Sequence, residues 1–227
     1  MELVQGKKRL HDDAATLAES GVSSDSGVVA VISKRLVKRL VKLRRKEDAP
    51  DDHPYDLNDP DRPVVLEIPR GTTEVSDDAF PYCWSVVSVT IPDSVTRIGE
   101  RAFSHCNSLT TLTIPESVTE IGDRAFMGCS SLTSLTIPES VTAIRNGAFA
   151  DCSSLTSLTM PESVSMIDDW VFYGCISLTT LTIPKSVTTI GNALAGCTSL
   201  RKLSLPVSLQ NRLPFLGQPS HCEVVLC

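Results

Sequence analysis

The sequence lacks most features that mark catalytic or membrane-spanning proteins. Only 5% of its 227 residues are aromatic and 41% are hydrophobic, so a core must be built from Leu, Ile and Val. No apolar run approaches the roughly 20 residues that a membrane-spanning helix needs, and the start of the chain has no apolar stretch of the signal-peptide type. We therefore expect an intracellular protein, located in the cytoplasm, with the nucleus as the alternative.

Motifs for metal, cofactor or nucleophile chemistry are also missing. The eight cysteines include no C-x2-C pair, and the four histidines are scattered, whereas zinc ligands cluster. No Gly-rich phosphate loop occurs. His105 precedes Cys106, but neighbours in sequence do not supply the geometry of a nucleophile and its base. The sequence therefore predicts no enzyme, no cofactor and no metal site.

Charge is distributed unevenly along the chain. The net charge of −6 is the sum of +6 in residues 1–46, −7 in residues 47–61 and −5 in residues 62–227. Residues 47–61, EDAPDDHPYDLNDPD, are rich in Pro and Asp and are typical of an extended linker. We predict three parts: a basic arm (1–46), an acidic linker (47–61) and a mildly acidic body (62–227).

An internal repeat accounts for the body. Ile-Pro or an equivalent dipeptide recurs with steps of 23 residues and a final step of 22, beginning at Ile68-Pro69 and ending at Leu205-Pro206. Two further series keep the same register. They are Phe80, Phe103, Phe126, Phe149, Phe172 with Leu194, and Cys83, Cys106, Cys129, Cys152, Cys175 with Cys197. Three parallel series indicate a solenoid in which each unit is one coil.

Within each unit the pattern predicts short elements. Residues 132–137, LTSLTI, alternate as a strand does, and the Pro that follows ends it. Val141 to Ile144 suit a second short extended piece, and Ala148-Phe149 a helical turn. We interpret the Cys series as a column of small buried thiols, and the glycines Gly99, Gly122 and Gly191 as serving backbone geometry. Residues 223–226 suit a terminal strand.

The pattern L-x-x-L-x-I-P-x-S-V-T-x-I-G-x-x-A-F-x-x-C resembles the leucine-rich repeats of the BspA-like (Treponema pallidum) class, over about residues 62–216. The resemblance implies an α/β repeat solenoid: a curved array of about seven 23-residue coils with one parallel strand per coil. The family includes surface adhesins and many protist proteins without a known role. The resemblance implies a non-enzymatic interaction module.

The outward face of the predicted sheet is the expected partner-binding surface. Its residues are mostly Thr and Ser, with basic residues at one end, and the aromatic Trp170 and Tyr173 depart from the repeat as a secondary patch. Thr is also a good exposed strand former, and an ice-binding array is a further alternative. The predicted partner-binding residues are Thr111, Thr113, Ser134, Thr136, Ser157, Thr159, Thr180, Thr182, Arg201, Lys202, Trp170 and Tyr173.

A second exposed column follows each Pro. It consists of Asp93, Glu116, Glu139 and Glu162, followed by Lys185. A solvated edge is the simplest interpretation, because carboxylates in water repel each other only weakly. A contact site for a basic segment is the sharper alternative.

The basic arm has the pattern of an amphipathic helix over residues 27–46. Val29, Ile32, Leu36, Leu40 and Leu43 share one face. The helix could cap the first coil, bind a partner helix, lie on an anionic membrane, or act as a nuclear-import or calmodulin-type target. Sequence-specific nucleic-acid binding is not expected, because the body is acidic. The residues available for a membrane or partner helix are Lys34, Arg35, Lys38, Arg39, Lys42, Arg44 and Arg45.

These features favour a non-enzymatic module that binds an unidentified protein partner through the sheet face. One alternative is a membrane- or polyanion-associated scaffold anchored by the basic helix. Another is an adhesin-like binder of glycan or matrix. The pattern does not specify an oligomeric state.

Overall fold

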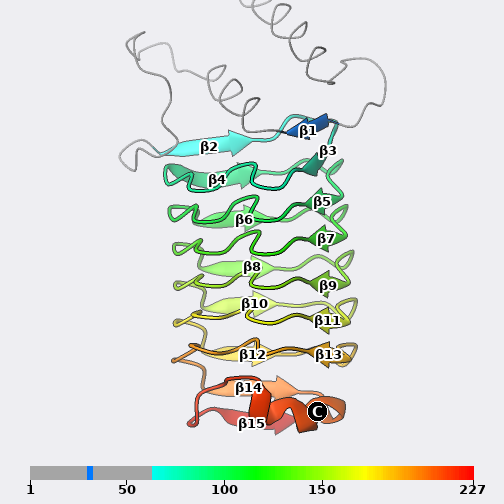
Figure 1. The fold of residues 1–227 in the computed structure, drawn as a ribbon, viewed down its shortest axis with the longest axis vertical. Coiled ribbons are helices and arrows are strands. Elements are labelled where there is room, and N and C mark those ends of the chain that lie inside the picture. Colours follow the sequence, from blue (N-terminus) through cyan, green and yellow to red (C-terminus); the bar gives the residue numbers. More distant parts are fainter. Residues whose placement is uncertain (1–29, 33–62) are drawn as a thin grey trace, which may run out of the picture.

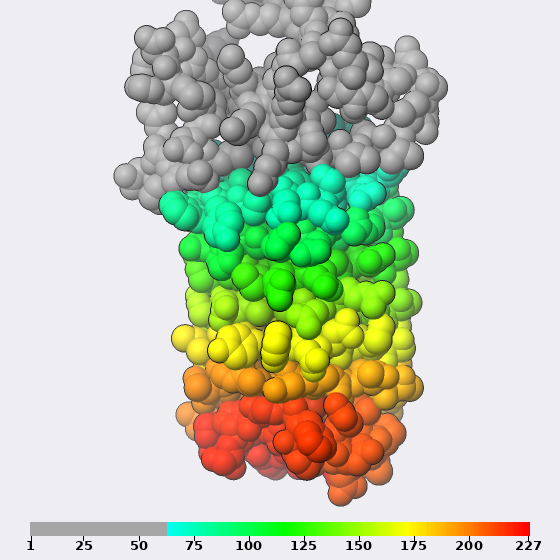
Figure 2. Space-filling view, in the orientation of Figure 1, coloured from blue at the N-terminus to red at the C-terminus, as the bar shows by residue number. Residues whose placement is uncertain are grey.

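The body of the protein is a column of stacked coils (Figure 1). The computed structural model describes Ala30–Ile32 and residues 63–227. Each coil contributes two short strands joined by tight turns, and equivalent strands of successive coils lie side by side. Figure 2 shows the coils as adjoining layers, coloured in chain order from one end of the column to the other.

One stack of strands follows the predicted L-x-x-L-x-I segments. Its members pair in parallel within three sheets, β2-β4-β6, β8-β10 and β12-β14-β15. Figure 1 shows the three sheets in one column. The strands are β2 (Val64–Glu67), β4 (Val86–Thr90), β6 (Thr111–Thr113), β8 (Ser134–Thr136), β10 (Ser157–Thr159), β12 (Thr180–Thr182), β14 (Lys202–Leu205) and β15 (Glu223–Leu226).

The second extended piece of each unit forms a separate parallel sheet of seven strands, in the order β1-β3-β5-β7-β9-β11-β13. The expectation of one strand per coil was therefore wrong, because the residues after S-V also pair with their equivalents. The strands are β1 (Ala30–Ile32), β3 (Thr72–Val75), β5 (Arg97–Ile98), β7 (Glu120–Ile121), β9 (Ala143–Ile144), β11 (Met166–Ile167) and β13 (Thr189–Ile190).

Strand pairing keeps the 23-residue register, so each residue lies beside its equivalent in the next coil. Leu158 pairs with Leu135, and Leu203 pairs with Leu181. The middle Leu of β6, β8 and β12 is buried while its two neighbours are exposed. This alternation is the one that the sequence predicts, because successive strand residues point to opposite faces.

The turn that returns each coil contains the Phe column. Its backbone bonds run from residue i to residue i−3, as from Cys152 N–H to the Phe149 carbonyl at 3.4 Å, so the predicted helical turn is a single tight turn. Among the described residues the only helix is the 3-10 helix η2 (Val207–Phe215). The described fold is thus a β-solenoid, and the α part of the predicted α/β class has no counterpart in it.

The Phe rings of successive coils form one continuous stack. Successive Phe rings from Phe80 to Phe172 stack with centroid distances of 5.2, 5.4, 5.6 and 6.3 Å. Nearly parallel rings at these distances are a favourable aromatic arrangement, so the Phe column adds to the contact between coils.

The six repeated cysteines form the predicted buried column. All six are free thiols and all are buried. Five of them, from Cys106 to Cys197, donate to the backbone carbonyl of a Phe in the preceding coil, at 3.1–3.4 Å. Burial raises the pKa of Cys129 and of Cys197 to about 12, because a thiolate would lose its hydration there. These thiols pack in the core, and their hydrogen bonds link adjacent coils.

Serine hydroxyls provide a second link between coils. Ser94, Ser117, Ser140, Ser163 and Ser186, the Ser of each S-V-T segment, each donate to a backbone carbonyl of the coil before. Every acceptor lies 22 residues earlier in the chain. The S-V-T motif is therefore explained by stacking, since a hydroxyl at this position satisfies a carbonyl at the turn.

The first coil receives an extra strand. Residues 30–32 form β1, which pairs with β3 through Val31–Glu74 and Ile32–Val75. The predicted helix over residues 27–46 therefore cannot include these three residues. An unpaired sheet edge favours a β-branched segment such as Val-Ile over a helix, because the strand satisfies its backbone groups. The rest of the predicted helix, and the linker 47–61, lie outside the described residues.

The last coil is covered by η2 and by β15. Leu209 and Leu216 of the η2 region are buried, and β15 pairs in parallel with β14 from Lys202–Glu223 to Leu205–Leu226. The predicted terminal strand is confirmed with the predicted bounds. These elements shield the core where the repeat ends, as capping units do in solenoids.

The Phe column yields a stability prediction. Phe126 is fully buried between two stacked rings, so Phe126→Ala should lower the free energy of unfolding by about 3–5 kcal/mol. Urea denaturation followed by circular dichroism measures this. The control Phe215→Ala removes a ring that is 60% exposed and should cost at most about 1 kcal/mol. Equal costs for the two variants would contradict the stacked core.

The Cys column yields a reactivity prediction. Near pH 8 iodoacetamide should modify the exposed Cys227 quickly and leave Cys129 unmodified in the native protein, because the thiolate is the reactive form. The stability contributed by the raised pKa of Cys129 is complete below the ordinary value of 9.0 and is lost as the pH rises towards about 12. Mass spectrometry of the labelled protein checks the labelling. Equal labelling of both thiols would show that Cys129 is not buried.

Candidate interaction surfaces

The structure places the predicted Thr and Ser residues on one exposed surface. We call the set Thr111, Thr113, Ser134, Thr136, Ser157, Thr159, Thr180 and Thr182 the Thr/Ser surface; all eight side chains are exposed. They form two columns, since Ser157 pairs with Ser134 and Thr159 with Thr136. The placement follows from strand alternation, which buries the Leu between them.

Hydroxyls just before these strands have a structural role instead. Thr110 and Thr156 donate to the carbonyls of Val87 and Thr133 in the preceding coil, at 3.1 and 3.0 Å. Within the Thr/Ser surface, the one side-chain bond between described residues joins Thr111 to Ser88 at 3.4 Å. The other hydroxyls of this surface face solvent, where they can bond to a ligand.

Arg201 and Lys202 lie at the C-terminal end of the Thr/Ser surface, and both are exposed. Lys202 pairs with Thr180 on one side and with Glu223 of β15 on the other. The sequence did not reveal this acidic neighbour, because Glu223 reaches the sheet only after η2. The C-terminal end of this surface therefore carries both basic side chains, Arg201 and Lys202, and an acidic one, Glu223.

Trp170 and Tyr173 form an exposed apolar patch together with Ile176. Their exposed fractions are 48%, 46% and 48%. Their equivalents in the preceding coil are Gly147, Ala150 and Ser153, so the larger side chains stand above small neighbours. We call these three residues the aromatic patch. Ile176 was missed by the sequence reasoning, although its equivalents Ser153 and Thr198 show the departure. The patch lies on the turn that precedes β12 in the chain.

The backbone at Trp170 is left-handed, with a φ angle of 58°. Its equivalent Gly147 has a φ angle of 60°. The equivalents in the three earlier coils, Asp78, Arg101 and Arg124, have φ angles of 51°, 50° and 52°. The left-handed turn is therefore a feature of the repeat and does not single out Trp170, although glycine adopts this conformation more freely than a bulky side chain does.

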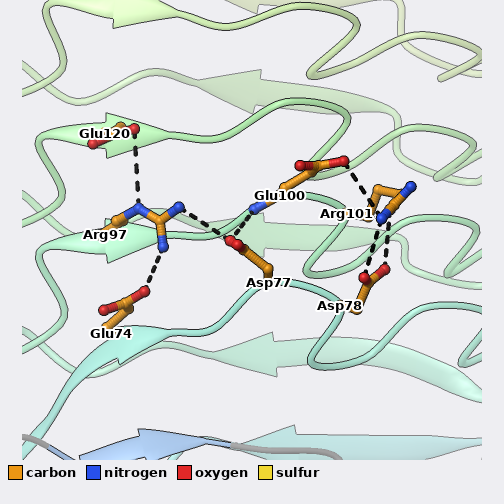
Figure 3. A network of polar contacts seen from close by, with 7 residues as sticks. All are labelled: Glu74, Asp77, Asp78, Arg97, Glu100, Arg101 and Glu120. Atoms are coloured by element: carbon orange, nitrogen blue, oxygen red, sulfur yellow. Dashed lines mark hydrogen bonds and ion pairs between the residues drawn. The ribbon is translucent and has the colours of Figure 1, made fainter.

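A different surface, on the seven-stranded sheet, carries a network of charges (Figure 3). Arg97 lies between Glu74 and Glu120 of the two adjacent strands, bonded to the first and 3.9 Å from the second. The Nη2 atom of Arg97 lies 3.0 Å from the Asp77 carboxylate. The column of Glu74, Arg97 and Glu120 alternates in sign, so the Arg97 side chain lies near a carboxylate of each adjacent coil.

A second Arg completes this network on the adjoining turn. Arg101 makes two bonds to the Asp78 carboxylate, at 3.0 and 3.1 Å. Its guanidinium also lies 3.5 Å from Glu100. Sequence reasoning missed both arginines, although the 23-residue spacing of Glu74, Arg97 and Glu120 is visible in the sequence.

Next to this network lies an open depression of about 520 Å³ that extends along five coils. Its charged lining comprises six carboxylates and two arginines, Arg97 and Arg145. Arg145 lies 4.0 Å from Asp168. The lining residues are Asp77, Arg97, Glu100, Glu120, Gly122, Asp123, Arg145, Asn146, Asp168 and Asp169. We call this surface the acidic depression.

Hydrogen bonds stabilise the charged form of Asp77. The Glu100 backbone N–H donates to its carboxylate at 2.7 Å and outweighs the cost of burial, and Arg97 adds to the effect, so the pKa of Asp77 is lowered from 3.8. Burial acts to lower the pKa of Arg97, but its bonds to Asp77 and Glu74 outweigh this and raise that pKa. Asp77 and Arg97 therefore both remain ionised at neutral pH.

The described residues offer no other chemical centre. They contain no group of three or more His, Cys, Asp or Glu side chains arranged to hold a metal ion. His105 stacks on Tyr82 with ring centroids 5.0 Å apart, and Cys106 is buried against the Phe80 carbonyl. No helix in this part of the chain is long and apolar enough to span a membrane. The basic residues Lys34 to Arg45 lie outside the described residues.

Comparison with known proteins identifies a family pattern. A BspA-type leucine-rich repeat region matches residues 73–201 in six copies. The crystal structure of a Treponema pallidum leucine-rich repeat protein is 32% identical, with a TM-score of 0.60, over 62% of this chain and 69% of that one. A leucine-rich cell surface protein of Faecalibacterium prausnitzii is 28% identical, with a TM-score of 0.37, over 71% of this chain and 59% of that one. No curated protein sequence matches the chain.

The lowered pKa of Asp77 predicts a pH-dependent effect. Asp77→Asn keeps an acceptor for the Glu100 N–H but removes the charge that faces Arg97. Because Asp77 is exposed, the variant should be less stable near neutral pH by at most about 1 kcal/mol. The stability that Asp77 contributes is present above 3.8 and is lost as the pH falls below that value.

Urea denaturation near neutral pH and near about pH 2.5, below the ordinary range of Asp, measures the difference. The matched control is Asp93→Asn, whose carboxylate makes no ion pair with a described residue. A stability difference for Asp77→Asn that persists unchanged in acid would contradict the role of its charge.

Proposed function

The chain belongs to the BspA-type leucine-rich repeat family, and we propose that it is a non-enzymatic module that binds a partner protein. Leucine-rich repeat proteins generally bind other proteins. The observation that carries the proposal is the aromatic patch, where Trp170, Tyr173 and Ile176 are each about half exposed on one turn. The Thr/Ser surface supplies the broader contact area.

The aromatic patch suits the energetic centre of an interface. Trp and Tyr are enriched among the few residues that dominate binding energy, because they bury a large area with little loss of side-chain entropy. The left-handed backbone at Trp170 recurs in the equivalent turns of the repeat, at Arg101 and Arg124 among others. What distinguishes Trp170 is its exposed ring, which stands where the preceding coil has only Gly147.

The Thr/Ser surface suits the surrounding contact. Its exposed hydroxyls and methyls lie in two straight columns and carry no charge until Arg201 and Lys202 at one end. Hydroxyls can donate and accept bonds without a large desolvation cost. Partner recognition through the sheet face thus combines modest polar contacts with a few apolar anchors. The cytoplasmic location predicted from the sequence stays a prediction.

Replacement of Trp170 separates binding from folding. Trp170→Gly should leave the free energy of unfolding within about 1 kcal/mol of the original, because the left-handed backbone is relaxed. Partner affinity should fall at least about tenfold, as expected for a central aromatic residue. Affinity capture from cells that express the protein, quantified by mass spectrometry, identifies proteins held by the original chain and lost with this variant.

The matched control is Tyr82→Gly. Tyr82 is an exposed aromatic residue with a φ angle of 59°, and it lies four coils from the patch. This variant should retain the captured partner. Thr136→Lys with Thr159→Lys should weaken capture, whereas Thr142→Lys with Ser165→Lys, outside the Thr/Ser surface, should not. Capture that is unchanged by Trp170→Gly and by the Thr136 and Thr159 pair would contradict the proposed surface.

A further inference from the structure

We propose that the acidic depression on the seven-stranded sheet binds the basic segment 33–46 of the same chain. Among the described residues nothing covers this face. The proposal concerns a different surface from the aromatic patch and does not depend on the proposed function. Three observations favour this occupant: the position of β1, the charges, and the length of the segment.

The chain enters its basic segment at the end of the depression. β1 ends at Ile32, which pairs with Val75 of β3. Asp77 follows Val75 by two residues and is the first residue of the depression. Ile32, after which the basic segment begins in the sequence, is therefore paired with the coil whose Asp77 begins the acidic depression.

The charges on the two sides are opposite and similar in number. Residues 33–46, SKRLVKRLVKLRRK, contain eight Lys or Arg residues and no Asp or Glu. The depression has six carboxylates, and its arginines Arg97 and Arg145 already lie near Asp77 and Asp168. Glu120 and Glu100 lie 3.9 and 3.5 Å from Arg97 and Arg101. Asp123 and Asp169 make no ion pair with a described residue, and the six carboxylates outnumber the two arginines of the lining. Unbalanced acids on a folded surface attract a cationic segment.

The sheet face also offers apolar contacts. The outward positions that follow Glu74, Arg97 and Glu120 along the sheet are Ala143 and Met166, which are half-buried. The basic segment contains Leu36, Leu40 and Leu43 between its charges. Leu and Met side chains can therefore pack together while the ammonium and guanidinium groups reach the flanking carboxylates.

The segment is long enough for the depression. Asp77 and Asp169 are equivalent residues four coils apart, so they span about 19 Å at a strand spacing of about 4.8 Å. A segment of 14 residues covers about 21 Å even at the helical rise of about 1.5 Å per residue. One segment can therefore contact all five coils of the depression.

The acidic column after each Pro is the competing docking site. Its residues Asp93, Glu116, Glu139 and Glu162 are exposed. Two of them already have structural roles, since Glu116 accepts the Glu139 backbone N–H and Glu162 accepts that of Ser186. The column begins at Asp93, in the coil of β5, whereas the depression begins at Asp77 in the coil of β3, which pairs with β1. The depression is favoured for these reasons.

Zero-length crosslinking of the full chain tests the proposal. A carbodiimide joins Lys34, Lys38, Lys42 or Lys46 to a carboxylate only where the two groups touch. We expect crosslinks to Glu120, Asp123, Asp168 and Asp169 that disappear between about 0.1 M and about 1 M salt, as the screening length falls from about 10 Å to about 3 Å. Crosslinks confined to the acidic column after Pro, or absent from the depression, would overturn the proposal.

Isotope mixing decides whether the contact is within one chain. Equal amounts of unlabelled and ¹⁵N-labelled protein are mixed before crosslinking. Crosslinked peptides that carry a single isotope support a contact within the chain. Pairs that combine both isotopes at random would show binding between copies and would overturn the intramolecular contact.

Trypsin cleavage within residues 33–46 gives an independent measurement on paired variants. Asp123→Asn with Asp168→Asn should speed this cleavage about fivefold, because exposed ion pairs that protect the segment are lost. The control Asp93→Asn with Glu139→Gln removes the same charge from the acidic column and should leave the rate unchanged. Equal cleavage rates in the two paired variants would contradict the proposal. The proposal would also be contradicted if anionic vesicles bound the segment and the depression gave it no protection from trypsin in their absence.

Discussion

Backbone pairing between coils in a fixed 23-residue register is the constraint on which the rest of the structure depends. The strands have two to five residues and are too short to be stable alone, so each is held by its equivalents in the adjacent coils. The register places every side chain beside its own equivalent about 4.8 Å away. A residue type that recurs at one position of the repeat therefore forms a column of like side chains along the stacked coils.

Columns of like residues are favourable only for some chemistry. Phe rings stack, Cys thiols donate to carbonyls of the coil before, and Ser hydroxyls do the same at the turn. Like charges in an exposed column repel only weakly in water, so the acidic column from Asp93 to Glu162 is tolerated. On the seven-stranded sheet, where the side chains are half-buried, Glu74, Arg97 and Glu120 alternate in sign on adjacent strands, so these neighbours attract each other.

Because the repeat makes most of the surface uniform, specific recognition must come from departures. Trp170 stands in a column whose neighbouring member is Gly147, and Ile176 in a column with Ser153. The acidic depression arises in a similar way. Arg145 and Asp168 occupy the column of Gly99 and Gly122, where an added Cβ on Gly122 would lie 2.8 Å from the backbone of the preceding coil. Each departure breaks the regular packing and creates a feature that a partner or a segment can recognise.

The sequence by itself determined the coils, their number, the buried Leu, Phe and Cys columns, the exposed Thr/Ser surface and the terminal strand. These follow from periodicity, because a repeated pattern has one stacking solution that buries every apolar column at once. The sequence also showed Trp170 and Tyr173 as exceptions to the repeat. Its error over Ala30–Ile32 has a clear cause: the local pattern favours a helix, while an open sheet edge stabilises a strand.

Only the tertiary structure decided which exceptions lie together. The second sheet, the network around Arg97 and the acidic depression combine residues from up to five coils, separated by 20 or more positions in the chain. Side-chain direction and the hollow between turns are properties of the stacked column and have no signature in a single unit. The left-handed backbone at Trp170 likewise becomes visible only in the turn that requires it. The repeat pattern in the sequence specifies the columns of side chains. The surfaces that can bind form where residues that depart from the repeat lie close together in the folded column.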